Sequence, residues 1–128
     1  MTRTGWFRAA VVVSGLMGAA GVILAAAAAH KTGGILLLSA SSMLLFHAPV
    51  TLLTILLVER QIVHPRLGLA AGGGFVAGAV LFSTDLTVLQ FLGHRLFPMA
   101  APSGGTLMIL SWLLLAVAAI WTRPATRL

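Results

Sequence analysis

The chain of 128 residues contains no cysteine and very little negative charge. The absence of cysteine excludes disulfides, thiolate metal sites and cysteine nucleophiles. Charged residues make up 8% of the sequence, and only two of them are acidic, Glu59 and Asp85. So small a polar fraction excludes a soluble domain, because too little polar surface would be available to face water.

Hydrophobic residues form 59% of the sequence, and the mean hydropathy is +1.07. Four apolar stretches, roughly residues 6–29, 34–58, 67–92 and 104–122, approach or exceed the ~20 helical residues that cross a bilayer core. The connections between them are short, so consecutive helices should lie antiparallel. The sequence therefore predicts an all-α membrane protein, with residues 1–128 forming a single up-down bundle of four transmembrane helices.

Positive charge, in contrast, is abundant, with a formal net charge of +6. The basic residues occur singly at the edges of apolar runs, which is typical of membrane orientation and unlike a nucleic-acid site. Two of them, Lys31 and Arg95, fall on one side of the predicted bundle. The other six fall on the opposite side, and they are Arg3, Arg8, Arg60, Arg66, Arg123 and Arg127. The positive-inside rule then predicts that both termini are cytoplasmic.

The first apolar stretch has an alternative interpretation as a signal peptide. Arg3 and Arg8 precede an apolar run that ends in the alanines of residues 25–29, which is similar to an A-x-A cleavage site. The run is longer than the usual hydrophobic region of a signal peptide. We therefore favour a first transmembrane helix and keep the cleaved form as the alternative.

Asp85 is the only charged residue within residues 67–92. A carboxylate inside the bilayer costs a few kcal/mol unless it finds a partner, and such groups are commonly functional. On a helical wheel Asp85 falls about 20° from Gly74 and from Gly78, small residues at which helices approach closely. We therefore expect Asp85 to face the inside of the bundle.

Several polar residues are candidate partners of this acid. His47 lies roughly 10 Å deeper on the neighbouring helix, too far for a direct bond to Asp85. The two side chains should lean toward each other, because their helices are antiparallel and side chains lean toward the N-terminus of their own helix. A single water could then join them, and Ser83 could belong to the same network. Arg95 is the better direct partner, because a flexible arginine can reach a carboxylate one or two turns below it.

Two histidines, His30 and His94, end their helices at similar depth. Paired imidazoles could ligate haem, or a divalent metal together with Asp85, but this spacing is a weak signal and boundary histidines are common. We therefore predict a polar network without metal, cofactor or catalytic residue. Its members are Asp85, His47, His30, Arg95, His94 and Ser83.

The link of residues 93–103 is unusually apolar for a loop. We expect it to fold back as a cap over the outer end of the bundle, with Ser103 as the N-cap of the fourth helix. This arrangement predicts a small pocket beneath Pro98 and Met99, with Asp85 as its floor and His94 or Arg95 at its rim.

The run from Phe82 to Asp85, followed by GHRLFPMAAPSGG and Trp112, resembles the C-terminal half of the domain of unknown function 423 family. That family comprises the YgdD-like and YwdK-like small integral membrane proteins. The stretch ending in His30 and the residues 46–48 are similar to its two other recurring segments. The chain departs from the pattern at Thr84, at Pro49 and in residues 26–29. The resemblance implies a four-helix protein of the bacterial inner (plasma) membrane or of mitochondria, and no established reaction.

Three classes of function are compatible with these features. The favoured one is a non-enzymatic binding or accessory protein whose outward-facing polar site holds a lipid headgroup, a quinone, another small amphipathic ligand or a partner helix. The alternative is a proton-coupled transporter or permeation path that uses Asp85, which would require a dimer because four helices enclose little volume. An enzyme is least favoured, since no nucleophile with an adjacent base or phosphate loop is visible. Beyond the lipid bilayer, the expected partners are a second copy or a larger membrane complex, and no nucleic acid.

Overall fold

A computed structural model describes residues 2–122 as four α-helices. They are α1 (Arg3–Ala29), α2 (Ile35–Glu59), α3 (Pro65–Leu92) and α4 (Ala100–Ile120). Each is long and apolar enough to cross a membrane, and the described residues contain no strand. The predicted all-α fold with four membrane-spanning helices is confirmed, and the chain is a multi-pass membrane protein. Arg123 and Arg127 lie outside the described residues.

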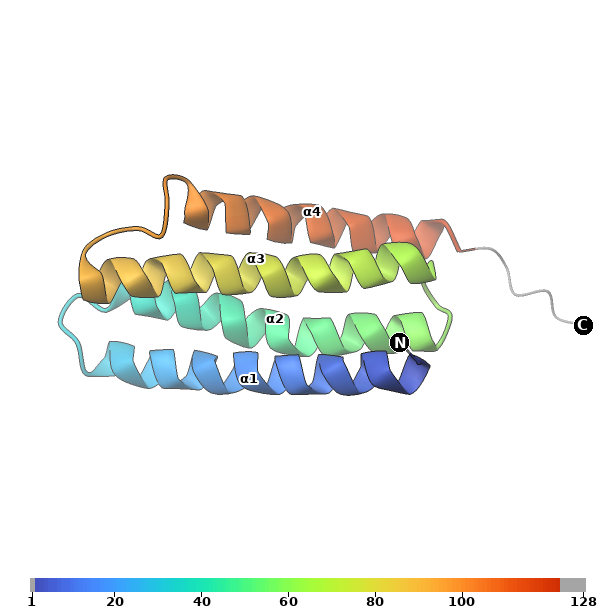
Figure 1. The fold of residues 1–128 in the computed structure, drawn as a ribbon, viewed down its shortest axis with the longest axis horizontal. Coiled ribbons are helices and arrows are strands. Elements are labelled where there is room, and N and C mark those ends of the chain that lie inside the picture. The colour runs from blue at the N-terminus through green and yellow to red at the C-terminus, as the bar shows by residue number, and fades with distance from the viewer. Residues whose placement is uncertain (1, 123–128) are drawn as a thin grey trace, which may run out of the picture.

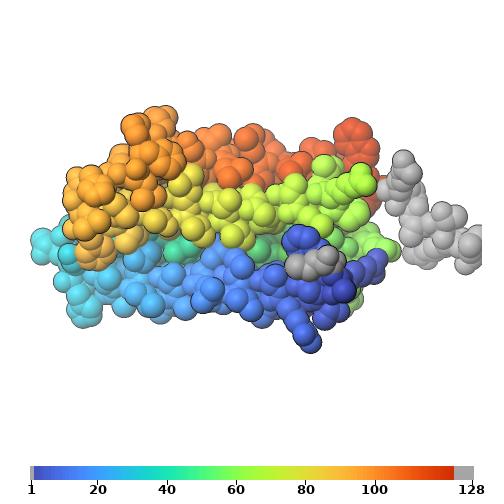
Figure 2. All heavy atoms as spheres, in the orientation of Figure 1, coloured from blue at the N-terminus to red at the C-terminus, as the bar shows by residue number. Residues whose placement is uncertain are grey.

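Consecutive helices pack side by side and antiparallel, α1 on α2, α2 on α3 and α3 on α4 (Figure 1). Helices α1 and α3 form much of the face seen in Figure 2, and α2 shows between them. The start of α1, the α2–α3 turn and the end of α4 lie at one end of the molecule, and the other two connections lie at the opposite end. Lys31 and Arg95 therefore share one end, as the charge pattern predicted.

The helix ends follow from local sequence. The Thr2 hydroxyl accepts the amide N–H of Gly5 at 3.1 Å and so caps α1. At α3, the His64 ring accepts from the amide of Leu67 at 3.4 Å, and Pro65 occupies the first turn, where it interrupts no helical hydrogen bond. Gly93 ends α3 in the left-handed conformation, which glycine adopts without strain.

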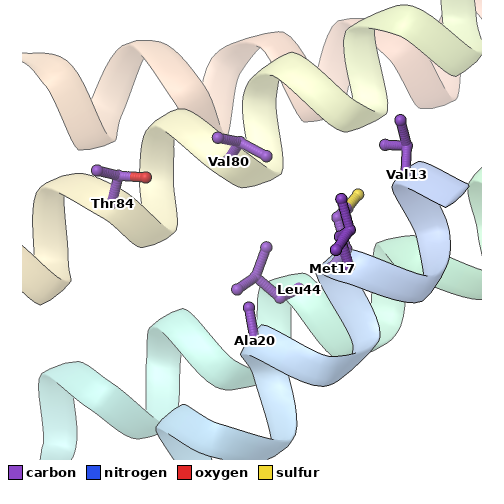
Figure 3. Close-up of a pocket in the computed structure, with 7 residues that line it drawn as sticks. Val13, Met17, Ala20, Leu44, Val80 and Thr84 are labelled. Atoms are coloured by element: carbon purple, nitrogen blue, oxygen red, sulfur yellow. The ribbon is translucent and has the colours of Figure 1, made fainter.

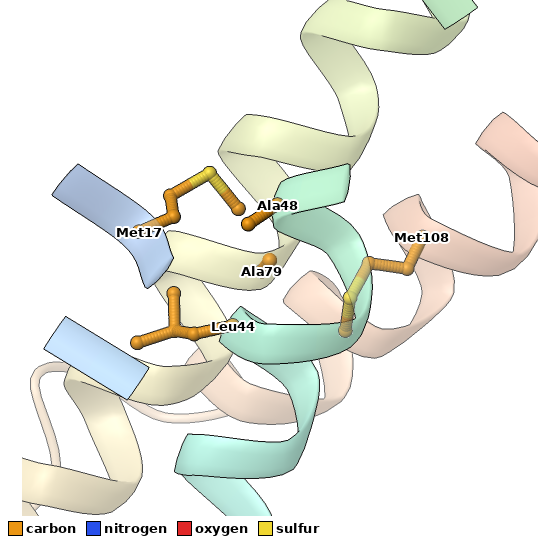
Figure 4. Close-up of a cluster of buried hydrophobic side chains, with 5 residues drawn as sticks. All are labelled: Met17, Leu44, Ala48, Ala79 and Met108. Atoms are coloured by element: carbon orange, nitrogen blue, oxygen red, sulfur yellow. The ribbon is translucent and has the colours of Figure 1, made fainter. Parts of the chain in front are cut away.

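The interior is built from small and flexible side chains of all four helices. Met17, Leu44, Ala48, Ala79 and Met108 form its central cluster (Figure 4).

Glycines bring the backbones of α3 and α4 together at one place. A Cβ added at Gly78 would lie 2.8 Å from the carbonyl oxygen of Gly104, and one at Gly104 would lie 2.7 Å from that of Gly78. This contact is the kind of small-residue packing that holds helices together in lipid.

The start of the fourth helix differs from the expectation. Helix α4 begins at Ala100 and not near residue 104, and Ser103 is not its N-cap. The N-cap position belongs to Met99, which is left-handed (φ 67°) and whose side chain makes no capping bond. The other helix ends lie within three residues of the expected ones. The reason for the early start of α4 lies in the contacts of Asp85.

Candidate functional site

Asp85 is completely buried, with 0% of its surface exposed. Its Oδ2 accepts a hydrogen bond from Nη1 of Arg95 at 2.8 Å, and the pair forms a salt bridge. The Arg95 side chain is 45% exposed, so it extends from the buried carboxylate to the surface. Both expectations, the inward direction of Asp85 and its pairing with Arg95, are confirmed.

The same carboxylate also binds the backbone of the link. Its Oδ1 accepts the amide N–H of Leu96 at 2.8 Å, and its Oδ2 accepts that of Ala101 at 3.2 Å. Ala101 is the second residue of α4, and an N-cap side chain normally accepts this amide. Asp85 thus caps α4 from the neighbouring helix, and its charge lies where the positive end of the helix dipole favours an anion.

Every N–H group of the first turn of α4 has an acceptor, and Asp85 supplies one of these acceptors. The amide of Ala100 donates to the carbonyl of Phe97 at 3.2 Å, that of Ala101 to Asp85, and that of Ser103 to the carbonyl of Met99 at 2.9 Å. The intervening residue is Pro102, which has no N–H. With these groups satisfied, the helix can begin at Ala100 without a serine cap.

The predicted pocket beneath Pro98 and Met99 does not have Asp85 as its floor. Hydrogen bonds of 2.8 and 3.2 Å place the link backbone directly on the carboxylate and leave no room for a ligand between them. The link does fold back as expected, but through its backbone, because Leu96, Phe97 and Met99 expose their side chains. A hollow of about 310 Å³ lies along the outer surface of the first turns of α4, and Asp85 does not line it.

His47 lies apart from this cluster of contacts. Its Nδ1 is 2.8 Å from the carbonyl oxygen of Met43, and its Nε2 is 3.3 Å from Nε1 of Trp112. The indole nitrogen can only donate, so Nε2 of His47 accepts, and the proton resides on Nδ1. Both ring nitrogens are therefore engaged, and the expected water bridge from His47 to Asp85 has no free ring nitrogen to use.

Ser83 does not join Asp85 either. Its hydroxyl donates to the carbonyl of Ala40 at 2.9 Å and so connects α3 to α2. The hydroxyl of Ser41 makes a similar bond to the carbonyl of Gly21 at 2.7 Å, which connects α2 to α1. Both contacts are cross-helix bonds of the kind that stabilise membrane bundles.

The remaining candidates, His30 and His94, are exposed at the same end as Arg95. The Nδ1 of His94 lies 3.0 Å from the carbonyl oxygen of its neighbour Arg95. Lys31 places its ammonium 4.4 Å from the ring centre of Phe91, a cation–π contact. Among residues 2–122 no three potential ligands come together to hold a metal ion.

Residues 17–105 match the family model described as "Protein of unknown function (DUF423)". The chain belongs to this family. The match covers Arg95, Leu96 and Ala101, which donate hydrogen bonds to Asp85, whereas Trp112 lies beyond it. No curated protein and no solved structure matches the chain of this DUF423 protein.

Three hydrogen-bond donors in the polar contacts of this DUF423 protein were not predicted from its sequence. The amides of Leu96 and Ala101 carry no sequence signal, since every residue other than proline has one. Trp112 is a long way from His47 in sequence and was noticed only as part of the family resemblance. Its indole N–H could have been flagged, because a polar N–H within a membrane span has no water to bind and needs a partner in the protein.

Proposed function

We propose that this DUF423 protein is a non-enzymatic accessory protein that binds an anionic headgroup of an amphipathic molecule at the end that carries Arg95. The observation that supports this function is the Asp85–Arg95 pair. The buried carboxylate engages one N–H of the guanidinium, and almost half of the arginine side chain stays exposed. An arginine held in this way is preorganised to present its other N–H groups to a phosphate or carboxylate.

The surroundings of Arg95 suit an anion with an apolar body. Lys31 places its ammonium over the ring of Phe91, which lies in the last turn of α3, four residues before Arg95 in sequence. Two cations therefore lie at this end. Asp85 offsets the charge of Arg95 through their salt bridge, and Glu59 lies at the other end, so Lys31 leaves this end with a net positive charge. Leu96 and Phe97 follow Arg95 in the link and expose their apolar side chains. Phospholipid headgroups with a net negative charge combine the required features.

A membrane orientation follows from the charge distribution. Of the six basic residues among residues 2–122, four lie at the opposite end: Arg3, Arg8, Arg60 and Arg66. By the positive-inside rule, we propose that both termini are cytoplasmic and that Arg95 lies at the outer face of a bacterial inner membrane. Because the chain lacks cysteine, single cysteines at Thr32, Pro98 and Ile62 can be tested with a membrane-impermeant thiol reagent. We expect labelling from outside at positions 32 and 98 only. Ile62 is 56% exposed and is a better probe than the buried Val63. Labelling of position 62 alone would show that the orientation is the reverse of the one proposed.

The alternative, a proton-coupled permeation path through a dimer, is our second choice. Asp85 is fully buried beneath Arg95 and the link, so a proton could reach its oxygens only if these groups moved. A binding role needs no such rearrangement, because the exposed part of Arg95 is already accessible.

The binding proposal can be tested by isothermal titration of the purified protein in a non-ionic detergent. The probes are dihexanoyl phosphatidylglycerol and dihexanoyl phosphatidylcholine, whose short chains cannot extend to the middle of the bundle. We expect the anionic lipid to bind more tightly, and Arg95→Gln to weaken its binding about tenfold, the value of one charge-assisted hydrogen bond. Lys31→Gln should weaken it less.

The matched control is Arg60→Gln, which removes an exposed arginine from the opposite end. It should leave binding unchanged. Equal binding of both lipids by the wild type, or equal losses in Arg95→Gln and Arg60→Gln, would disprove a specific site at Arg95. Far-UV circular dichroism of each variant establishes that it is folded.

A further inference from the structure

A second, separate feature lies in the middle of the bundle. Helices α1 and α3 flank an apolar groove of about 280 Å³ whose floor is formed by α2 (Figure 3). Its lining includes Val13, Met17 and Ala20 of α1, Leu44 of α2, and Val80 and Thr84 of α3. Thr84 contributes the one polar side chain of this lining. Val13 to Ala20 occupy the central turns of α1, so the groove lies near the middle of the membrane.

The α3 side of the groove continues as a strip of small, exposed residues. Ala70, Gly73 and Ala77 are all exposed and lead to Val80 and Thr84 at steps of three and four, so these five residues lie along one face of the helix. A Cβ added at Gly73 would meet nothing within 4 Å. We call Ala70, Gly73 and Ala77 the α3 strip.

Arg66 stands at the far end of the α3 strip. It precedes Thr84 by five full helical turns and therefore lies on the same face, at the end of the molecule opposite Arg95. It is exposed and forms no salt bridge among residues 2–122. An anion at the membrane surface could therefore approach it directly.

We propose that the groove and the α3 strip bind one acyl chain of an anionic phospholipid whose headgroup contacts Arg66. The lengths agree: half of a bilayer core is about 15 Å, or about ten helical residues. An acyl chain that starts beside Arg66 thus reaches Val76 to Val80, where the groove begins. This lipid belongs to the leaflet opposite the one that Arg95 contacts, so it is distinct from the headgroup site proposed there.

The dimensions favour an acyl chain over a transmembrane helix of a partner or of a second copy. A volume of about 280 Å³ is at the small end of the range for ligand pockets, roughly 300–1,000 Å³. A helix with its side chains is about 10 Å across, so a single turn occupies on the order of 400 Å³, more than the volume of the groove. The positive charge of Arg66, aligned with the apolar path, matches a molecule with an anionic head and an apolar tail.

Native mass spectrometry from non-ionic detergent tests the proposal, with palmitoyl-oleoyl phosphatidylglycerol and the matching phosphatidylcholine as probes. We expect the wild type to retain one phosphatidylglycerol in preference to phosphatidylcholine. Ala20→Leu and Ala77→Leu should each displace about two methylenes of the chain and lower retention of both lipids about tenfold. Arg66→Gln should retain both lipids equally, because only the headgroup contact is lost.

The matched control is Ala116→Leu, the same substitution at an exposed position of α4, which should retain lipid as the wild type does. Arg95→Gln should also retain it, so this site can fail or hold independently of the one at Arg95. Equal lipid retention by Ala20→Leu and Ala116→Leu would overturn the proposal. So would an Arg66→Gln variant that still prefers phosphatidylglycerol to phosphatidylcholine as the wild type does. A wild-type dimer that Ala20→Leu converts to a monomer would assign the groove to a second copy instead.

Discussion

Among residues 2–122, one backbone bond, from His64 to the carbonyl of Ala118 at 2.8 Å, and two side-chain contacts fasten α4 to the rest of the bundle. The two side-chain contacts differ in kind. At the end that carries Arg95, the charged carboxylate of Asp85 takes up Arg95, Leu96 and Ala101 at 2.8 to 3.2 Å. Nearer the middle of α4, a single neutral bond of 3.3 Å joins Trp112 to His47. Asp85, the acceptor of the first contact, is fully buried, whereas Trp112, the donor of the second, is 40% exposed.

The difference shows what each polar group requires of its surroundings. A charge withdrawn from water must be matched by donors at nearly every lone pair, so Asp85 draws in the backbone of the link as well as Arg95. The conformation of the link and the start of α4 are then consequences of satisfying one carboxylate. A neutral imidazole needs only one donor and one acceptor, which Trp112 and the carbonyl of Met43 supply. His47 therefore orients α4 without reshaping the chain.

Removal of the carboxylate should have the largest effect on stability. Asp85→Ala leaves the amides of Leu96 and Ala101 without an acceptor and releases Arg95. We expect the free energy of unfolding to fall by about 3 kcal/mol, toward the lower end of the range for a broken buried pair because Arg95 is half-exposed. Reversible unfolding in mixed detergent micelles, followed by circular dichroism, measures this change.

Asp85→Asn separates shape from charge. The amide retains one acceptor oxygen for the link but cannot match both amides and the guanidinium at full strength. The free energy of unfolding of Asp85→Asn should lie between that of the wild type and that of Asp85→Ala. A wild-type unfolding curve for Asp85→Ala would show that the three bonds to Asp85 contribute nothing to holding α4.

The architecture was predictable because hydropathy alone defines the spans. Each stretch contains few charges and enough length, and short links allow only antiparallel neighbours, so four helices followed directly. The start of α4 was not predictable in this way. Ser103 looked like an N-cap in sequence, but a carboxylate from α3 supplies the cap, and a bond between residues sixteen positions apart leaves no local signal.

Within the site, the sequence predicted which way a side chain points better than it predicted which groups that side chain binds. The position of Asp85 relative to Gly74 and Gly78 placed it inside, and the flexibility of Arg95 predicted the pair that is observed. The network with His47 and Ser83 was wrong, because depth estimates say nothing about the tilt and rotation that bring His47 to Trp112 and Ser83 to Ala40. Backbone donors such as Leu96 are invisible to any search for polar side chains.

An intermediate effect should come from the contact between α3 and α4 that uses no polar side chain. In Gly104→Ala the new methyl group would lie 2.7 Å from the carbonyl oxygen of Gly78 and 2.8 Å from the amide nitrogen of Phe82. Because both neighbours are backbone atoms, the helices must separate, and we expect a loss of about 2 kcal/mol. Gly73→Ala is the matched control, since its methyl group meets nothing within 4 Å. Equal stability of the two variants would mean that the helices do not approach as closely as described.

The smallest effect should come from the neutral bond, and a double-mutant cycle isolates it. Trp112→Phe removes the indole N–H while an aromatic ring still faces Phe75, whose ring centre lies 4.9 Å away. His47→Phe removes the acceptor. Polar contacts between transmembrane helices average about 0.6 kcal/mol in such cycles, and we expect a coupling free energy of that size between Trp112 and His47. Trp121→Phe alters an exposed indole near the end of α4, and its coupling free energy with His47→Phe should be zero. A coupling above about 2 kcal/mol would exceed what membrane bundles show for such bonds, and it would make His47 as strong an attachment of α4 as Asp85.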